Sequence, residues 1–350
     1  MIFIGMDVHV RNSFLHITDE GGQLLKRGRC ANTLSDFAAF LAPLDAETGY
    51  VALESTTNSR AIARMIRQAA THSHLELAVE VLDARKLRII AESVSKCDRR
   101  DAAMLNELSR ANLKLPACYM PDDEVFALRE HLRARSDLVR IRTSVKNRVH
   151  AVLHRRGVLT PLGGLFTQGG RTFLAQAQLD DAGSTIMQLY LRTIDQLNGL
   201  ITESNDSLKQ LTRRPRWAKP AALLQTMPGV GLITAMTILA ELGDPKRFRR
   251  RAAVANYAGL VPVVRDSNDK RYRGGITKRG STHLRAVLIE AAWIAIKRVP
   301  TYNHLFERVT RRSNKLTAIV AVARRMLEDA WTMLKREEAF RYSAMPSVAG

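Results

Sequence analysis

The sequence has few of the residues on which disulfide and zinc frameworks depend. Its 350 residues include three cysteines, Cys30, Cys97 and Cys118, and none of them forms a CxxC pair. An odd number of widely spaced cysteines argues against a disulfide-stapled fold and against a cysteine-ligated zinc site. Free cysteines suit a reducing compartment, so we expect a cytoplasmic protein.

Long uninterrupted apolar runs are also missing. Residues 1–8 are apolar, but they lack a basic region and include Asp7, so they do not form a signal peptide. Residues 221–242 approach the length of a membrane span, yet Pro228-Gly229-Val230-Gly231 divides them into two short helices. We therefore expect no membrane partner. The hydrophobic content of 46% indicates folded domains rather than a disordered chain.

Acidic side chains are outnumbered by basic ones. The chain has 34 Asp and Glu against 54 Lys and Arg, which gives a net charge of +20. Residues 209–315 alone contain 23 Lys or Arg and 6 Asp or Glu, a balance of +17. A charge excess of this size predicts a polyanionic partner, bound mainly by the C-terminal half.

The N-terminal third alternates between strand and helix patterns. Three apolar runs predict a meander of strands at 2–8, 14–18 and 23–28, with a turn at 19–22. Further elements follow: a helix at 34–44, a strand ending at Glu54, a helix at 58–70, a strand at 77–82 and a helix from about residue 84. This order predicts a ribonuclease-H-like α/β domain over residues 1–118.

The rest of the chain is mostly helical by pattern. Residues 122–156 and 183–212 carry apolar heptads, interrupted by Arg135, Arg142 and Lys146 in the first and by Ser204 in the second. The helical, coiled-coil-like segment at 119–214 either mediates dimerisation or folds back as a hairpin within one chain. Residues 161–170 predict a loop and 213–220 a linker. A mostly α domain at 215–342 and a tail at 343–350 complete the chain.

Four acids stand where a metal-dependent nuclease needs them. Asp7 and Glu54 close apolar strands, where a lone carboxylate is costly unless it is paired or binds a cation. Asp98 and Asp101, three residues apart, share one helix face. Two-metal phosphoryl chemistry requires such a group of carboxylates. Each acid alone has an ordinary reading as a turn or helix-cap residue, but together they predict a site.

The basic half contains two candidate nucleic-acid elements. Residues 224–235 have the form of a helix-hairpin-helix, in which Gly229 and Gly231 permit a tight turn that holds a DNA phosphate; an ordinary interhelical turn is the alternative. Ser267 is expected in a polar loop, where a hydroxyl could attack phosphorus. From chemistry alone a solvated turn serine is favoured, because no His or Glu base is adjacent. The candidate phosphate contacts are Arg265, Lys270, Arg271, Arg273, Lys278 and Arg279.

Motifs along nearly the whole chain resemble the DEDD transposases of the insertion-sequence one-ten group, which are RNA-guided (bridge-RNA) recombinases. The motifs are Gly5-Met6-Asp7-Val8-His9, Leu53-Glu54-Ser55-Thr56, Lys96-Cys97-Asp98-Arg99-Arg100-Asp101-Ala102, Met227-Pro228-Gly229-Val230-Gly231, Gly243-Asp244-Pro245-Lys246-Arg247-Phe248, Tyr257-Ala258-Gly259-Leu260-Val261-Pro262 and Ile276-Thr277-Lys278-Arg279-Gly280 with Leu284-Arg285.

The resemblance implies a RuvC-like domain in which Asp7, Glu54, Asp98 and Asp101 form a catalytic, Mg²⁺-binding tetrad. It also implies that Ser267 is a nucleophile that forms a covalent phosphoserine link to DNA. The implied partners are donor and target DNA, a noncoding guide RNA and further copies of the chain, as dimers that pair into a tetramer, at the nucleoid. Two residues depart from the family pattern: Asn268 follows the serine where glycine is usual, and Cys97 replaces threonine.

Two other functions remain open on the sequence. A RuvC-like junction resolvase would use the same acids with metal-activated water and would not need Ser267. A non-catalytic nucleic-acid scaffold would bind through the basic half with an inactive acidic site.

Overall fold

The computed structural model describes residues 1–84, 86–87, 97–111, 115–161, 163–267 and 270–341, with backbone alone at 264–267 and 270–273. The chain divides into two compact units, Met1–Met120 and Pro121–Gly350. The first is a mixed α/β unit and the second is mostly helical, as the sequence predicts. Within the described ranges, no helix is long and apolar enough to cross a membrane.

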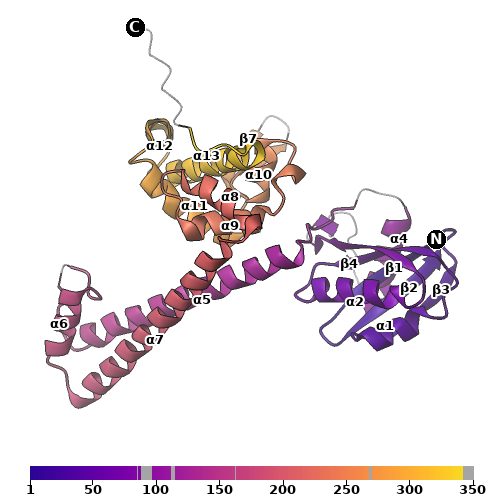
Figure 1. Cartoon of the computed structure of the whole chain (residues 1–350), viewed down its shortest axis with the longest axis horizontal. Helices are drawn as coiled ribbons and strands as arrows, with labels where there is room; N and C mark the ends of the chain where they lie inside the picture. The colour runs from indigo at the N-terminus through magenta and orange to yellow at the C-terminus, as the bar shows by residue number, and fades with distance from the viewer. Residues whose placement is uncertain (85, 88–96, 112–114, 162, 268–269, 342–350) are drawn as a thin grey trace, which may run out of the picture. The chain divides into compact units, whose positions relative to one another are not determined.

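The first unit is built on a five-stranded sheet with the order β3-β2-β1-β4-β5 (Figure 1). β1 pairs antiparallel with β2 and parallel with β4, β2 pairs antiparallel with β3, and β4 pairs parallel with β5. The strands span Ile2–Val8, Asn12–Asp19, Leu24–Ala31, Thr48–Glu54 and Glu76–Leu82. This arrangement is compatible with a ribonuclease-H-like fold, and the three-strand meander predicted from the sequence is confirmed.

Helices cover both faces of this sheet (Figure 1). On one face, α1 (Leu34–Leu41) and α2 (Ser59–Thr71) share a core with Ile4 and Met6 of β1. On the other face lies α4 (Asp98–Arg110). Because successive strand residues point to opposite faces, Gly5 and Asp7 face α4 while Ile4 and Met6 face the main core.

Buried Asn106 fixes α4 to the sheet. Its side-chain amide donates to the carbonyl of Phe3 at 2.6 Å and of His16 at 3.0 Å, and its oxygen accepts from the Thr18 hydroxyl at 2.9 Å. Gly5 leaves the room for this approach, because a Cβ there would lie 2.5 Å from the Asn106 backbone nitrogen. The start of α4 is thereby held over the carboxyl end of β1.

The second unit begins with a long helical hairpin (Figure 1). α5 (Asp123–His154) packs against α7 (Asp181–Leu211), and α6 (Gln168–Gln176) lies between them in sequence. The polar interruptions of the heptads pair across the hairpin: Arg135 donates to Asn205 at 2.6 Å, Arg142 to Asn198 at 2.9 Å, and His131 contacts Ser204 at 3.0 Å. These contacts fix the register of α5 against α7 within one chain.

The remainder of this unit is a helical domain with one β-hairpin. It comprises α8 (Pro215–Gln225), α9 (Leu232–Leu242), η1 (Pro245–Arg247), α10 (Arg251–Tyr257), β6 (Pro262–Ser267), β7 (Lys270–Ile276), α11 (Thr282–Ala295), α12 (Pro300–Arg312) and α13 (Lys315–Arg336). Its core gathers side chains from α5, α8, α9, α11 and α13.

Three local predictions were wrong. The expected linker at 213–220 mostly belongs to α8, because Pro215 suits a first helical position and Trp217 is buried. The expected loop at 161–170 ends inside α6, whose start Thr167 caps. The polar loop expected around Ser267 is mostly the β6–β7 hairpin, because only residues 268–269 separate the strands. The helix expected from residue 84 lies largely outside the described residues.

Candidate active site

Asp7 and Glu54 lie at the carboxyl ends of neighbouring parallel strands. The pairing of β1 with β4 runs to Met6 and Leu53, and the two acids come next along each strand. Both side chains are half-buried. Ala52, two residues before Glu54, shares a small core with Leu105 of α4, so Glu54 faces the same side of the sheet as Asp7.

Asp98 and Asp101 stand in the first turn of α4. A helix N-terminus is electropositive and favours carboxylates there. Because Gly5 lets α4 pack close to β1, this first turn lies over the strand end that carries Asp7. Acids far apart in the sequence therefore meet on one face of the sheet.

His9 joins two of these acids into a compact group. Its Nε2 lies 3.4 Å from a carboxylate oxygen of Asp7 and 3.3 Å from one of Asp98. Ligand atoms of Asp7, His9 and Asp98 all lie within 4.8 Å of one another. Carboxylate oxygens suit Mg²⁺, and an imidazole nitrogen suits transition metals, so these residues fit a divalent cation.

Arg29 of β3 reaches the same group. It donates to Asp98 at 2.8 Å. The strand register explains the reach: Asp7 pairs with Phe14 on β2, and Phe14 pairs with Arg29 on β3, so the three residues form one row across the sheet. This row ends in a cation beside the acids.

Both burial and the neighbouring acids disfavour the charged form of Asp7. Burial raises the pKa of Asp7, and the nearby carboxylates Asp98 and Asp101 raise it further, while His9 acts in the opposite direction. The pKa of Asp98 is lowered, first by its hydrogen bond to His9 and also by Arg29. A bound cation would relieve the repulsion that Asp7 experiences.

Asparagines hold the loop that presents His9. The Asn32 amide donates to the His9 carbonyl at 2.8 Å, and the Asn58 amide donates to the same oxygen at 3.0 Å. Neither His9 nor Arg29 was singled out as a site residue from the sequence. The sequence could have indicated His9, since alternate residues 5, 7 and 9 point to one face of an extended chain. Recognising Arg29 requires the register between the strands.

Not all four predicted acids enter the compact group. Within the part of the chain that the structure describes, that group comprises Asp7, His9 and Asp98. Asp101 follows Asp98 by three residues in the first turn of α4, close enough to affect the pKa of Asp7. Glu54 faces the same side of the sheet from the end of β4.

Ser267 belongs to the second unit, at the end of β6, where it pairs with Lys270 of β7. The base of this hairpin is tightly anchored. Thr277 donates to the carbonyl of Val261 at 2.9 Å and Lys278 to that of Gly259 at 3.2 Å. Gly259 has a positive φ of 67°, and a Cβ there would lie 2.6 Å from the Arg279 nitrogen.

Buried Arg285 completes this anchor from α11. Its Nη1 donates to the carbonyl of Ala258 at 3.0 Å and to that of Gly280 at 3.1 Å. It thus ties together the two chain segments that lead into β6 and out of β7. Of the predicted phosphate contacts near the hairpin, Lys278 and Arg279 are exposed, while the side chains of Arg265, Lys270, Arg271 and Arg273 lie outside the described ones.

The two glycines of the Pro228-Gly229-Val230-Gly231 turn differ in their surroundings. Gly229 has a φ of 88°, and a Cβ there would lie 3.1 Å from the Ala291 carbonyl carbon, so this glycine allows the turn to pack on α11. Gly231 precedes α9 and has open space around its Cβ position. Gly229 therefore has a packing role, and Gly231 leaves the start of α9 accessible.

Models of known protein families match a segment in each half of the chain. A DEDD transposase model of the IS110 type matches residues 4–156, and the model of the transposase IS116/IS110/IS902 family matches residues 221–307. The transposase for insertion sequence element IS1328 of Yersinia enterocolitica is 26% identical over 344 residues, which are 96% of this chain and 98% of that protein.

Other relatives match shorter stretches. The transposase for insertion sequence element IS1111A of Coxiella burnetii is 29% identical over 263 residues, 71% of this chain and 70% of its own length. The protein y4qE of Sinorhizobium fredii is 30% identical over 239 residues, 67% of this chain but only 55% of its own length. The pilin gene-inverting protein of Moraxella bovis is 26% identical over 165 residues, 44% of this chain and 51% of its own length. With models of one family matching both halves in order, the chain belongs to the IS110 family of DEDD transposases, enzymes of DNA transposition and recombination.

Proposed function

We propose that this transposase cuts and rejoins DNA strands of an insertion sequence through Ser267, with Asp7, Glu54, Asp98 and Asp101 binding Mg²⁺. The observation that supports it best is the group of carboxylates around His9 at the carboxyl edge of the sheet. Mg²⁺ bound there would neutralise phosphate charge and stabilise the developing negative charge on oxygen.

The proposed chemistry conserves the number of phosphodiester bonds. The Ser267 Oγ forms a bond to phosphorus as the bond from phosphorus to a deoxyribose oxygen breaks. The serine loses its hydroxyl proton, and the leaving oxygen gains one. Reversal by a different strand end would rejoin DNA without an external energy source. The anchor made by Gly259 and Arg285 supports this role, because a nucleophile must be held within a few tenths of an ångström of its productive position.

A denaturing gel tests the nucleophile. The wild-type chain, incubated with element-end DNA, the RNA that co-purifies with it and Mg²⁺, should yield a covalent protein–DNA adduct, and Ser267→Ala should bind DNA but yield none. Ser207→Ala, on the exposed face of α7, is the matched control and should behave as wild type. An adduct that persists in Ser267→Ala would exclude this serine.

The denaturing gel and a calorimetric titration together separate the other two functions. A junction resolvase that activates water would cleave DNA in a Mg²⁺-dependent way and leave no protein attached. A non-catalytic scaffold would neither cleave nor bind the ion, so calorimetric titration with Mg²⁺ of the wild type and of Asp7→Asn distinguishes it. Under our proposal, Asp7→Asn and Asp101→Asn lose strand cleavage.

We also propose that a noncoding bridge RNA guides the choice of donor and target DNA. A chain with a net charge of +20 has the electrostatic capacity to bind RNA as well as DNA. Guidance by base pairing would delegate sequence specificity to the RNA. Sequencing of RNA that co-purifies with the protein should find one structured species, and a random sample of cellular RNA would argue against guidance.

Self-association completes the proposal, with dimers that pair into a tetramer in the bacterial cytoplasm, at the nucleoid. The α5–α7 hairpin exposes Ile141, Leu189 and Leu200, which are 47%, 52% and 47% accessible and would be covered in a coiled-coil-like dimer. Sedimentation analysis with Leu189→Glu and Leu200→Glu should show smaller assemblies. The turn at Gly229 and Gly231 would act as a helix-hairpin-helix, with the start of α9 on a DNA phosphate.

A further inference from the structure

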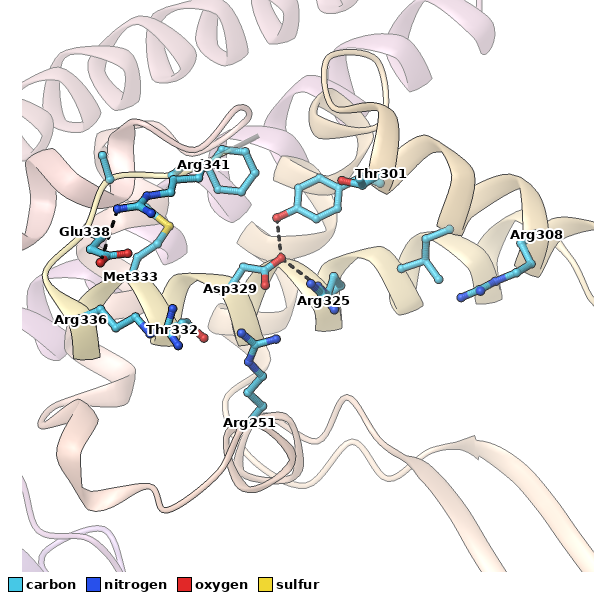
Figure 2. A pocket seen from close by; sticks show the side chains of 14 residues that line it. Arg251, Thr301, Arg308, Arg325, Asp329, Thr332, Met333, Arg336, Glu338 and Arg341 are labelled. Atoms are coloured by element: carbon cyan, nitrogen blue, oxygen red, sulfur yellow. Dashed lines mark hydrogen bonds and ion pairs between the residues drawn. The ribbon is translucent and has the colours of Figure 1, made fainter. Parts of the chain in front are cut away.

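The second unit contains a cavity of about 780 Å³ whose walls come from α10, α12, α13 and the stretch at 338–341 (Figure 2). Five arginines line it, and we call them the arginine pocket: Arg251, Arg308, Arg325, Arg336 and Arg341. Two acids, Asp329 and Glu338, also line it, which leaves an excess of three positive charges. The volume is in the range of ligand sites, roughly 300–1,000 Å³, but the charge excludes an apolar occupant.

Both acids of this cavity are already engaged. Asp329 accepts hydrogen bonds from the Tyr302 hydroxyl at 3.0 Å and from Arg325 at 2.9 Å, and Glu338 lies 3.5 Å from Arg341. Figure 2 shows these contacts as the dashed lines of the pocket. Asp329 therefore pairs with Arg325, and Glu338 with Arg341. Neither carboxylate neutralises the other three arginines.

Arg251, Arg308 and Arg336 form no ion pair with any described acid. They approach the cavity from three helices, α10, α12 and α13. Guanidinium groups gathered around one cavity repel one another unless an anion enters. Their planar, five-donor geometry suits the paired oxygens of a phosphate.

The walls of the cavity are well fixed. Tyr302 is 2% accessible, and its ring lies 6.0 Å from that of Phe340. The backbone nitrogen of Phe340 donates to the Thr226 hydroxyl at 2.8 Å, which holds the 338–341 wall against the end of α8. These buried contacts hold the helices that carry the arginines, so binding an anion orders the exposed arginine side chains but does not have to order the frame.

We propose that the arginine pocket binds phosphate groups of a nucleic-acid backbone, as a contact separate from the strand-cleaving site. This proposal rests on the proposed function in one respect: the proposed function supplies nucleic acid as the partner. A pocket of guanidinium groups contacts phosphodiester oxygens and reads no base edges, so it positions the strand without selecting its sequence. The phosphodiester chemistry is common to DNA and RNA.

Equilibrium binding of the full chain tests this proposal. Affinity for fluorescein-labelled duplex DNA, and for an RNA of the same sequence, is measured across a salt series without divalent cations. Arg308→Gln and Arg336→Gln should each weaken binding and lower the slope of log affinity against log salt by about 0.9 for duplex DNA or about 0.7 for single-stranded RNA. Arg308→Lys should retain most of the slope.

Arg140→Gln is the matched control, because Arg140 is 80% exposed on α5 and pairs with Asp137. Its slope should equal that of the wild type. A loss of affinity and salt slope for only one of the two polymers supports the proposal and assigns the pocket to that polymer. Unchanged slopes and affinities for both DNA and RNA in the Arg308→Gln, Arg336→Gln double variant would overturn it. Tryptophan-fluorescence melting verifies that the variants fold.

Failure of this proposal is distinguishable from failure of the proposed function. The binding experiment contains no metal and requires no chemistry, whereas the nucleophile experiment scores a covalent adduct. An absent adduct in the wild type would refute cleavage through Ser267 and leave the salt slopes unaffected.

Discussion

Replacement of Gly5 by alanine provides a direct test of how the fold positions the acidic site. The substitution adds one methyl group in the middle of β1, on the face that α4 covers. The new Cβ would lie 2.5 Å from the Asn106 nitrogen and 3.0 Å from the Ala102 carbonyl carbon, and the Ala102 oxygen would be closer still. All three atoms are backbone, so no side-chain rotation can relieve the overlap.

The size of the effect follows from these distances. An ordinary contact begins at 3.4 Å, so α4 must move away from β1 by at least 0.9 Å at Asn106. Overpacking of a core typically costs about 1–3 kcal/mol. Because Asp98 and Asp101 move with α4 while Asp7 stays on β1, strand cleavage should fall about 100-fold, the usual effect of a misplacement of about 1 Å.

Hydrogen exchange read by mass spectrometry measures the stability change, since peptides from β1 and α4 report on the first unit. The tryptophans Trp217, Trp293 and Trp331 all lie in the second unit, so their fluorescence melting should not change. Gly28→Ala on β3 is the control, because its Cβ would meet Phe40 at an ordinary 3.4 Å. Wild-type protection and cleavage in Gly5→Ala would refute the close packing of α4 on β1.

Three further predictions concern other contacts. Asn106→Leu should lower protection of β1 amides by about 1–3 kcal/mol, because the partly buried carbonyls of Phe3 and His16 lose their donor. Arg285→Met should reduce covalent adduct yield while DNA affinity stays unchanged, since the base of the serine hairpin loosens. The pKa of Asp122 is lowered, chiefly by its hydrogen bond from Arg216. The stabilisation that this pair gives the fold is therefore fully present above a pH of about 3.9 and is lost as the pH falls through the lowered pKa. Asp122→Asn should therefore remove that acid-dependent loss in a fluorescence titration of Trp217.

Much of the fold could be predicted from the sequence, because the spacing of apolar residues reflects which side chains are buried. The meander, the alternating elements after it and the two long helices are all visible in the spacing of apolar residues. Boundaries were less accurate where polar residues lie inside regular structure. The β6–β7 hairpin escaped prediction because Arg265, Lys270, Arg271 and Arg273 resemble loop residues, although strand pairing depends on backbone groups that every residue has.

The site shows the same division. Asp7 and Glu54 were singled out by sequence because carboxylates that close apolar strands are costly without a partner or a cation. Asp98 and Asp101 were added because acids three residues apart share one helix face. His9 and Arg29 were not, since their relevance depends on distances between segments. Only the register across β1, β2 and β3 places Arg29 beside Asp98, and only the packing of α4 over Gly5 brings Asp98 to within reach of His9.

The sequence by itself therefore determined the kinds of element, the charge that calls for a polyanion and the identity of the acids. Tertiary structure alone decided which charges meet. It joined Asp7, His9 and Asp98 in one group, and it gathered Arg251, Arg308 and Arg336 from three helices around one cavity. The physical reason is that periodicity is a local property of the chain, whereas electrostatic interactions depend on separations through space, which packing sets.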